Sequence, residues 1–107
     1  MKTAILSRSN RPSKKFMVRV GNRTIHFGAN GYEDFTIHKD PKRKARYLAR
    51  HKNENWNNPK SAGFWARWVL WNKPTLAESI KDISKLGTTV TLQSANLLIE
   101  PHSEHTN

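Results

Sequence analysis

The chain has 107 residues, a formal net charge of +11 at pH 7 and no cysteine. Its length suits one domain with a modest core, and without cysteine it has neither a disulfide framework nor a thiolate metal site. No apolar run approaches the roughly 20 residues of a membrane-spanning helix, and Ala4-Ile5-Leu6 is too short for the apolar segment of a secretory signal. We therefore expect neither a membrane span nor export.

Positive charge is concentrated in the first 60 residues, which hold 15 of the 19 lysines and arginines but 4 of the 8 acidic residues. The remaining residues hold 4 of each kind. One strongly positive end or face attracts polyanions, nucleic acid first and then acidic protein surfaces or anionic lipid. The alternative is a soluble protein that is basic without a polyanionic partner.

Residues 1–15 are predicted to form a flexible basic arm, because they contain no acid and too few apolar residues to order themselves. Bound to a partner, this arm would lie along phosphates or in a groove of another subunit. Its predicted polyanion contacts are Arg8, Arg11, Lys14 and Lys15.

The segment 16–28 reads as a β-hairpin with a two-residue turn at Gly21-Asn22. Counting outward from the turn pairs Val20 with Arg23, Val18 with Ile25 and Phe16 with Phe27, which places the large apolar side chains on one face. Residues 29–39 form a connection rich in glycine and asparagine, with a possible short strand at Phe35–Ile37.

A basic helix is predicted from Asp40, its N-cap, to about Lys52. A narrow apolar stripe of Ala45, Leu48 and Ala49 should face the core. Beside it lies an arc of basic residues, which is either a solvated face or a polyanion contact: Lys42, Arg43, Arg46 and Arg50.

Ser61 to Pro74 is predicted to be an aromatic helix at the centre of the core. At about 100° per residue, Phe64, Trp68 and Trp71 share one face, and Trp65 extends it. Arg67 and Ala66 are left for water. The predicted core residues of this helix are Phe64, Trp65, Trp68 and Trp71. The alternative is a sticky outer face for base stacking or for a partner protein.

The rest of the chain is predicted to form a helix from Thr75 to Leu86, which starts with a capping box, and a strand around Val90 and Leu92. Residues 94–107 are expected to form a tail that docks on a partner through Leu97, Leu98 and Ile99. The predicted fold is α+β, with one compact domain at 16–93 in which a small sheet packs on the tryptophan-rich helix between two flanking helices.

Two stretches resemble a known family: TIHFGANGYEDFTIHKD (24–40) and ENWNNPKSAGFWARWVLWNKPTL (54–76). With the basic helix between them and the helix after them, they resemble a family of small uncharacterised proteins of large DNA viruses, including giant and algal viruses. The resemblance covers roughly residues 14–87. It implies a protein of the virion and the infected host cell, and it supplies no catalytic residue.

No catalytic or metal motif stands out. His26, His38 and His51, with Asp34 and Asp40, match no compact ligand spacing. We therefore expect a non-enzymatic protein with no metal, no cofactor and no small-molecule substrate.

Two functions remain open. The first is a minor structural component of the particle, which docks among capsid proteins through its termini. Ordering the termini opposes binding by about 1–2 kcal/mol per residue, and a small domain has little surface to offset this, so we expect residues 1–15 and 94–107 to contact mainly other chains. The alternative is a sequence-independent nucleic-acid-binding protein that compacts or packages the viral genome.

Overall fold

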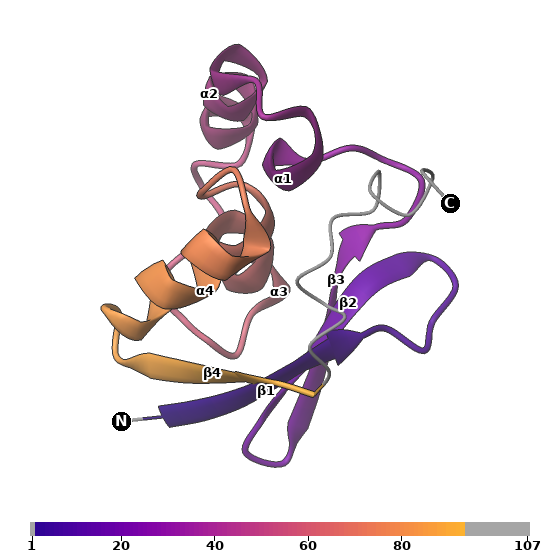
Figure 1. Ribbon diagram of the computed structural model, residues 1–107, viewed down its shortest axis with the longest axis vertical. Helices are drawn as coiled ribbons and strands as arrows, with labels where there is room; N and C mark the ends of the chain where they lie inside the picture. Colours follow the sequence, from indigo (N-terminus) through magenta and orange to yellow (C-terminus); the bar gives the residue numbers. More distant parts are fainter. Residues whose placement is uncertain (1, 94–107) are drawn as a thin grey trace.

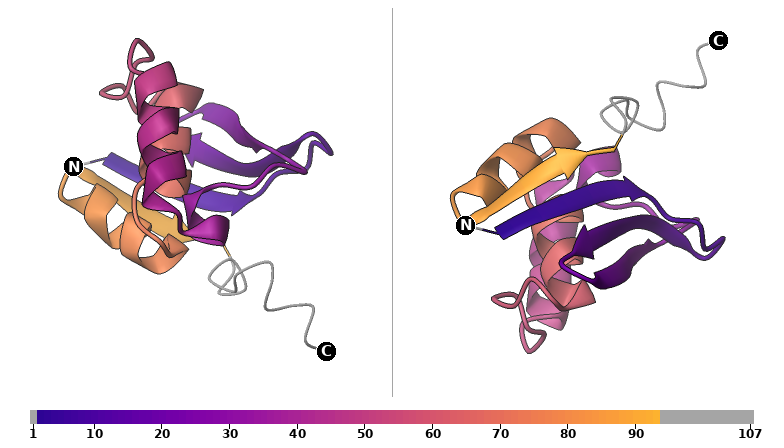
Figure 2. Two further views of the ribbon diagram at one scale, coloured as in Figure 1. Left: turned by 90° about the horizontal axis from the view of Figure 1, so that it is seen from above. Right: turned by 90° about the horizontal axis from the view of Figure 1, so that it is seen from below.

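A computed structural model describes residues 2–93, which form a four-stranded sheet with all helices on one of its faces (Figures 1 and 2). The strands are β1 (Lys2–Arg8), β2 (Lys14–Val20), β3 (Arg23–Ala29) and β4 (Thr88–Leu92), in the order β3-β2-β1-β4. The helices are α1 (Phe35–His38), α2 (Pro41–Arg50), α3 (Ala62–Trp65), the π-helical turn η1 (Ala66–Leu70) and α4 (Leu76–Ser84). The predicted α+β class, with a sheet on a tryptophan-rich helix, is confirmed.

The prediction of a flexible arm over residues 1–15 is wrong, because β1 is an inner strand of the sheet. It pairs antiparallel with β2 and parallel with β4. Its side chains Ala4 and Leu6 are fully buried, while Ile5 lies on the open face. The domain therefore begins before Phe16. Both edges of β1 pair with strands of its own chain.

The β2–β3 hairpin is confirmed with the predicted register. Phe16 lies opposite Phe27, Val18 opposite Ile25, and Val20 opposite Arg23. Gly21 adopts φ +62° in the turn, a conformation that glycine reaches without steric strain. The two phenylalanine rings touch in the core, with centroids 5.9 Å apart.

The tryptophan-rich helix lies against the sheet, but it does not keep a regular α-helical period. The backbone N–H of Trp71 donates to the carbonyl of Ala66, five residues earlier, in the π-helical turn. The buried residues are therefore spaced by five, with Phe64 and Val69 as one pair and Trp65 and Leu70 as the other. Trp68 and Trp71 are only partly buried against this core, so the predicted face was correct for Phe64 and Trp65 alone.

The possible strand at Phe35–Ile37 is wrong, because these residues belong to α1. Asp34 caps this helix by accepting hydrogen bonds from the backbone N–H and the hydroxyl of Thr36. The β-branched side chains that suggested a strand are outweighed by this cap.

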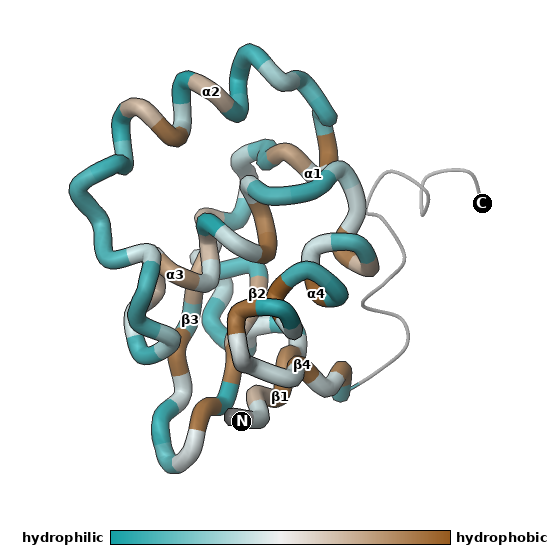
Figure 3. Tube along the Cα trace, turned by 90° about the vertical axis from the view of Figure 1, so that its left-hand side faces the viewer, coloured by the Kyte–Doolittle hydropathy of each residue, from teal (hydrophilic) through white to brown (hydrophobic). Residues whose placement is uncertain are grey.

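The basic helix is confirmed as α2, with Asp40 as its N-cap and Pro41 as its first residue. Its predicted apolar stripe is wrong, since Ala45 and Ala49 are exposed and Leu48 is partly exposed. The buried residue is Tyr47. Figure 3 shows accordingly that the trace of α2 is hydrophilic over most of its length.

The predictions for the last helix and strand are confirmed. The hydroxyl of Thr75 accepts from the backbone N–H of Glu78 at the start of α4, as the capping box requires. β4 follows and lies beside β1. The predicted docking residues Leu97, Leu98 and Ile99 lie outside the described residues.

Candidate functional site

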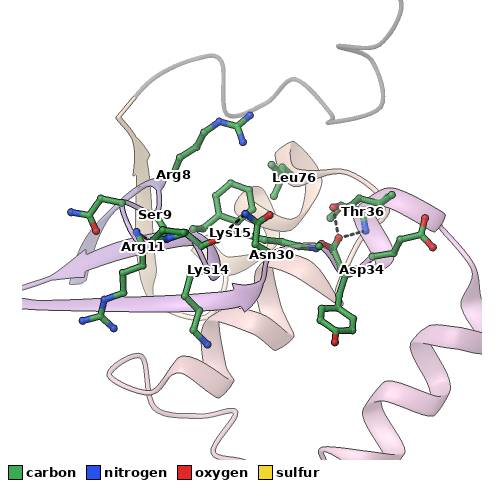
Figure 4. Close-up of a pocket in the computed structure, with 16 residues that line it drawn as sticks. Arg8, Ser9, Arg11, Lys14, Lys15, Asn30, Asp34, Thr36 and Leu76 are labelled. Atoms are coloured by element: carbon green, nitrogen blue, oxygen red, sulfur yellow. Dashed lines mark hydrogen bonds and ion pairs between the residues drawn. The ribbon is translucent and has the colours of Figure 1, made fainter.

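A cavity of about 550 Å³ lies where the β1–β2 loop meets the β3–α1 loop (Figure 4). All four basic residues predicted for the arm line it: Arg8, Arg11, Lys14 and Lys15. In Figure 4, Arg8 extends to one side of the ribbon, while Arg11 and Lys14 extend to the other. The fold therefore gathers these charges at one end of the sheet, opposite the β2–β3 turn.

Hydrogen bonds hold the two loops of this cavity together. The side-chain amide of Asn30 donates to the carbonyl of Pro12 at 3.0 Å, and its backbone N–H donates to the carbonyl of Ser13 at 2.9 Å. The hydroxyl of Ser9 lies 2.8 Å from Nδ1 of His26 on β3. The cavity wall is thus attached to the sheet at several points.

One of the predicted polyanion contacts, Lys15, already has an anionic partner in the chain. Its Nζ lies 2.5 Å from a carboxylate oxygen of Asp34, and both side chains are largely buried. Asp34 also caps α1. This ion pair joins β2 to α1, so Lys15 has a structural role and has little charge left for a ligand.

A second cavity of about 310 Å³ lies between β3, α2 and α3. It is lined partly by aromatic rings, among them Phe27, Tyr47 and Trp71. The two cavities share five lining residues, Lys14, Lys15, Tyr32, Glu33 and Asp34, so they are neighbours across the β3–α1 loop.

Glu33, at this shared boundary, connects the cavities to α2. Its carboxylate lies 3.0 Å from Nη1 of Arg43. On a helix, Arg43 lies on the same side as Arg46 and Arg50. One residue of the predicted basic arc, Arg43, therefore contacts the β3–α1 loop that borders both cavities.

Of the eight predicted polyanion contacts, five make no ion pair with an acidic residue in the described part of the chain: Arg11, Lys14, Lys42, Arg46 and Arg50. We call these five residues the basic face. Lys15 is paired with Asp34, and Arg43 is paired with Glu33. These two ion pairs also neutralise the two carboxylates that line the first cavity. The positive charge of the basic face is therefore available to an anionic ligand.

Beneath α2, a row of stacked rings attaches this helix to the core. Trp71 contacts His38 on one side, with ring centroids 5.3 Å apart, and Tyr47 on the other, at 4.3 Å. Tyr47 in turn stacks on His51, which is paired with Glu54. Burial raises the pKa of Tyr47 to about 12, so its hydroxyl is neutral at pH 7 and supplies no general base.

Arg67, which we expected in water, is partly buried between aromatic rings. Its guanidinium lies 4.2 Å from the ring centroid of Trp68 and 5.4 Å from that of Trp56. It also donates to the carbonyl of Trp71 at 2.9 Å. Trp68 therefore holds a cation of its own chain, and its face is not free for a base.

His26 contacts Ser9, which follows the end of β1, and partial desolvation, Arg11 and Lys14 all lower its pKa. It is therefore neutral at pH 7. No three potential metal ligands gather anywhere in residues 2–93. Over the same range, no helix has both the length and the apolar character to cross a membrane.

A model of a family of unknown function (DUF5754) matches residues 4–51. The match runs from β1 to the end of α2, so it includes all five residues of the basic face. It includes the first stretch of the resemblance, 24–40, but not the second, 54–76. No curated protein and no solved structure matches the chain. The viral origin thus stays an expectation.

Proposed function

We propose that the protein binds nucleic acid through the phosphate backbone, without reading the base sequence. The observation that supports this proposal is the Arg43–Glu33 ion pair. This ion pair connects α2 to the β3–α1 loop, which borders the first cavity together with Arg11 and Lys14. Five cations without an acidic partner in residues 2–93, in a molecule with extents of 37 × 32 × 26 Å, suit a polyanion with closely spaced charges.

The β1 strand weakens the other function, that of a minor virion component. That function was to use residues 1–15 as a docking arm, whereas residues 2–8 lie inside the sheet of their own domain. Docking through Leu97, Leu98 and Ile99 concerns residues outside the described part. Binding of nucleic acid is therefore the function that we rank first.

The test is the salt dependence of binding, measured by fluorescence anisotropy of labelled duplex DNA with the full chain. If each of the five residues of the basic face neutralises one phosphate, log K should fall against log salt with a slope of about −4.5, from about −0.9 per contact. Replacing Arg11 and Lys14 by Gln should make this slope less steep by about 1.8.

A charge-matched control removes the same number of charges elsewhere. Arg19→Gln with Arg23→Gln alters β2 and the start of β3, beside the β2–β3 turn at the other end of the sheet. This variant should keep a slope close to that of the unmodified chain. An equal effect of both pairs would show that only net charge matters, and salt-independent binding, or no binding at low salt, would refute the proposal.

A further inference from the structure

The most exposed large apolar side chain of residues 2–93 lies at the boundary of the two cavities. Tyr32 is 74% exposed, compared with 43% for Ile5 and 48% for Leu86. It lines both cavities. Within the described chain its ring stacks on no other aromatic ring. A ring that is this exposed and has no stacking partner offers a face to a ligand.

The loop that carries Tyr32 is fixed on both sides of this residue. Two positions before it, Asn30 bonds to the β1–β2 loop. Two positions after it, Asp34 is held by Lys15 and caps α1. Gly31, with φ +89°, makes the turn between these anchors. Because its neighbours are held, little backbone entropy is lost when a ligand stacks on the ring.

We propose that this site binds single-stranded nucleic acid, with one unpaired base stacked on Tyr32 and the adjoining phosphates at Arg11 and Lys14. The inference rests on the proposed function and adds the kind of strand to it. Base–aromatic stacking tolerates any sequence, since every base has a π face. The bases of a duplex already stack on one another and present mainly phosphates to a surface.

The composition of the first cavity is consistent with this ligand. Its volume of about 550 Å³ lies within the usual range for small-molecule sites. Beside the cations it is lined by Ser9, Asn10 and Asn30. Side-chain amides such as those of Asn10 and Asn30 form hydrogen bonds with sugar oxygens and base edges, whereas the hydroxyl of Ser9 is already bonded to His26 and to the backbone N–H of Arg11. Basic groups, polar groups and one open ring therefore lie around the same space.

The test compares three labelled probes of equal length with the full chain: oligothymidylate, oligouridylate and an abasic DNA strand. The abasic strand keeps the phosphates and removes the stacking. Tyr32→Ala should weaken binding of the two base-containing strands about tenfold, which is near the lower end of measured base–aromatic stacking. Affinity for the abasic strand and the salt slope should not change.

Two variants control this experiment. Tyr32→Phe keeps the ring and should bind as the unmodified chain does, while Leu86→Ala removes another exposed apolar side chain remote from the cavities and should have no effect. If the unmodified chain binds abasic and thymidylate strands equally, or if Tyr32→Ala loses nothing, the stacking inference is wrong while phosphate binding stands. If no probe binds in a salt-dependent way, the proposed function itself is wrong.

Discussion

The ring of Tyr47 lies parallel to the indole of Trp71, with centroids 4.3 Å apart and an interplanar angle of 3°. This contact is the main apolar attachment of α2 to the rest of the protein, because Tyr47 is the buried residue of the helix. Two polar contacts support it, Arg43 to Glu33 and Lys44 to the carbonyl of Asn72. The aromatic pair and these two polar contacts thus together position the three residues of the basic face on α2.

Replacing Tyr47 by Ala should lower the free energy of unfolding by roughly 3 kcal/mol, since it removes a buried aromatic ring and its stacking. Tyr47→Phe keeps the ring and should change stability by less than about 1 kcal/mol. Urea denaturation followed by tryptophan fluorescence measures both. Equal stability of the two variants would show that α2 is held by its polar contacts instead.

The two central tryptophans of the aromatic helix should differ in their contribution to stability. Trp65 is fully buried, so Trp65→Ala should lower the free energy of unfolding by roughly 3–5 kcal/mol. Trp68 is only partly buried and stacks on Arg67, so Trp68→Ala should lower it by less than about 3 kcal/mol. The same denaturation experiment ranks them, and the reverse order would contradict the five-residue spacing of the buried face.

Neighbouring residues of β1 provide a test of this strand. Leu6→Ala should lower the free energy of unfolding by roughly 2–5 kcal/mol, because the side chain is fully buried. Ile5→Ala removes a similar volume from the open face of the sheet and should have an effect below about 1 kcal/mol. If thermal denaturation finds both variants as stable as the unmodified chain, residues 2–8 form an arm and not an inner strand.

The structural features that could be predicted from the sequence are those with a local signal. The β2–β3 register follows from a two-residue turn and the alternation around it, and the N-caps at Asp40 and Thr75 follow from side chains close to the helix starts. β1 gave no such signal, since Ala4 and Leu6 are its only buried residues over the described side chains of residues 3–8. It is ordered by hydrogen bonds to β2 and β4, and β4 lies about 80 residues away in sequence.

The candidate site was predicted in part. Eight basic residues were predicted as polyanion contacts from charge alone, whereas the pairing of Lys15 with Asp34 and of Arg43 with Glu33 depends on the folded chain. Tyr32 was missed because it lies in a turn, outside any periodic pattern. An aromatic residue next to Gly31 and before two acids was the available signal, and its exposure appears only in the fold.

We expect His38 to make the stability of the fold depend on pH. Its Nδ1 accepts a hydrogen bond of 2.9 Å from the backbone N–H of Asp40, the N-cap of α2. A protonated ring cannot accept this bond. Burial, with a smaller contribution from Arg43, lowers the pKa of His38 below its ordinary value of about 6.5. The unfolded chain therefore takes up a proton at a higher pH than the folded chain does.

The sign of the resulting pH dependence follows by linkage. Stability contributed by neutral His38 is fully present above the unfolded pKa of about 6.5 and is lost as the pH falls through the lower folded pKa. The melting temperature should therefore fall when the pH is lowered from about 7.5 to about 5.5, a range in which carboxylates of ordinary pKa stay ionised.

The variant His38→Asn tests this prediction, because its side-chain oxygen can accept the same bond without titrating. Its melting temperature should fall less over that pH range, even if the smaller side chain makes it less stable at pH 7.5. Because the pKa of His26 is also lowered, some dependence on pH should persist in the variant. Identical losses in the unmodified chain and in His38→Asn would show that His38 does not carry this sensitivity.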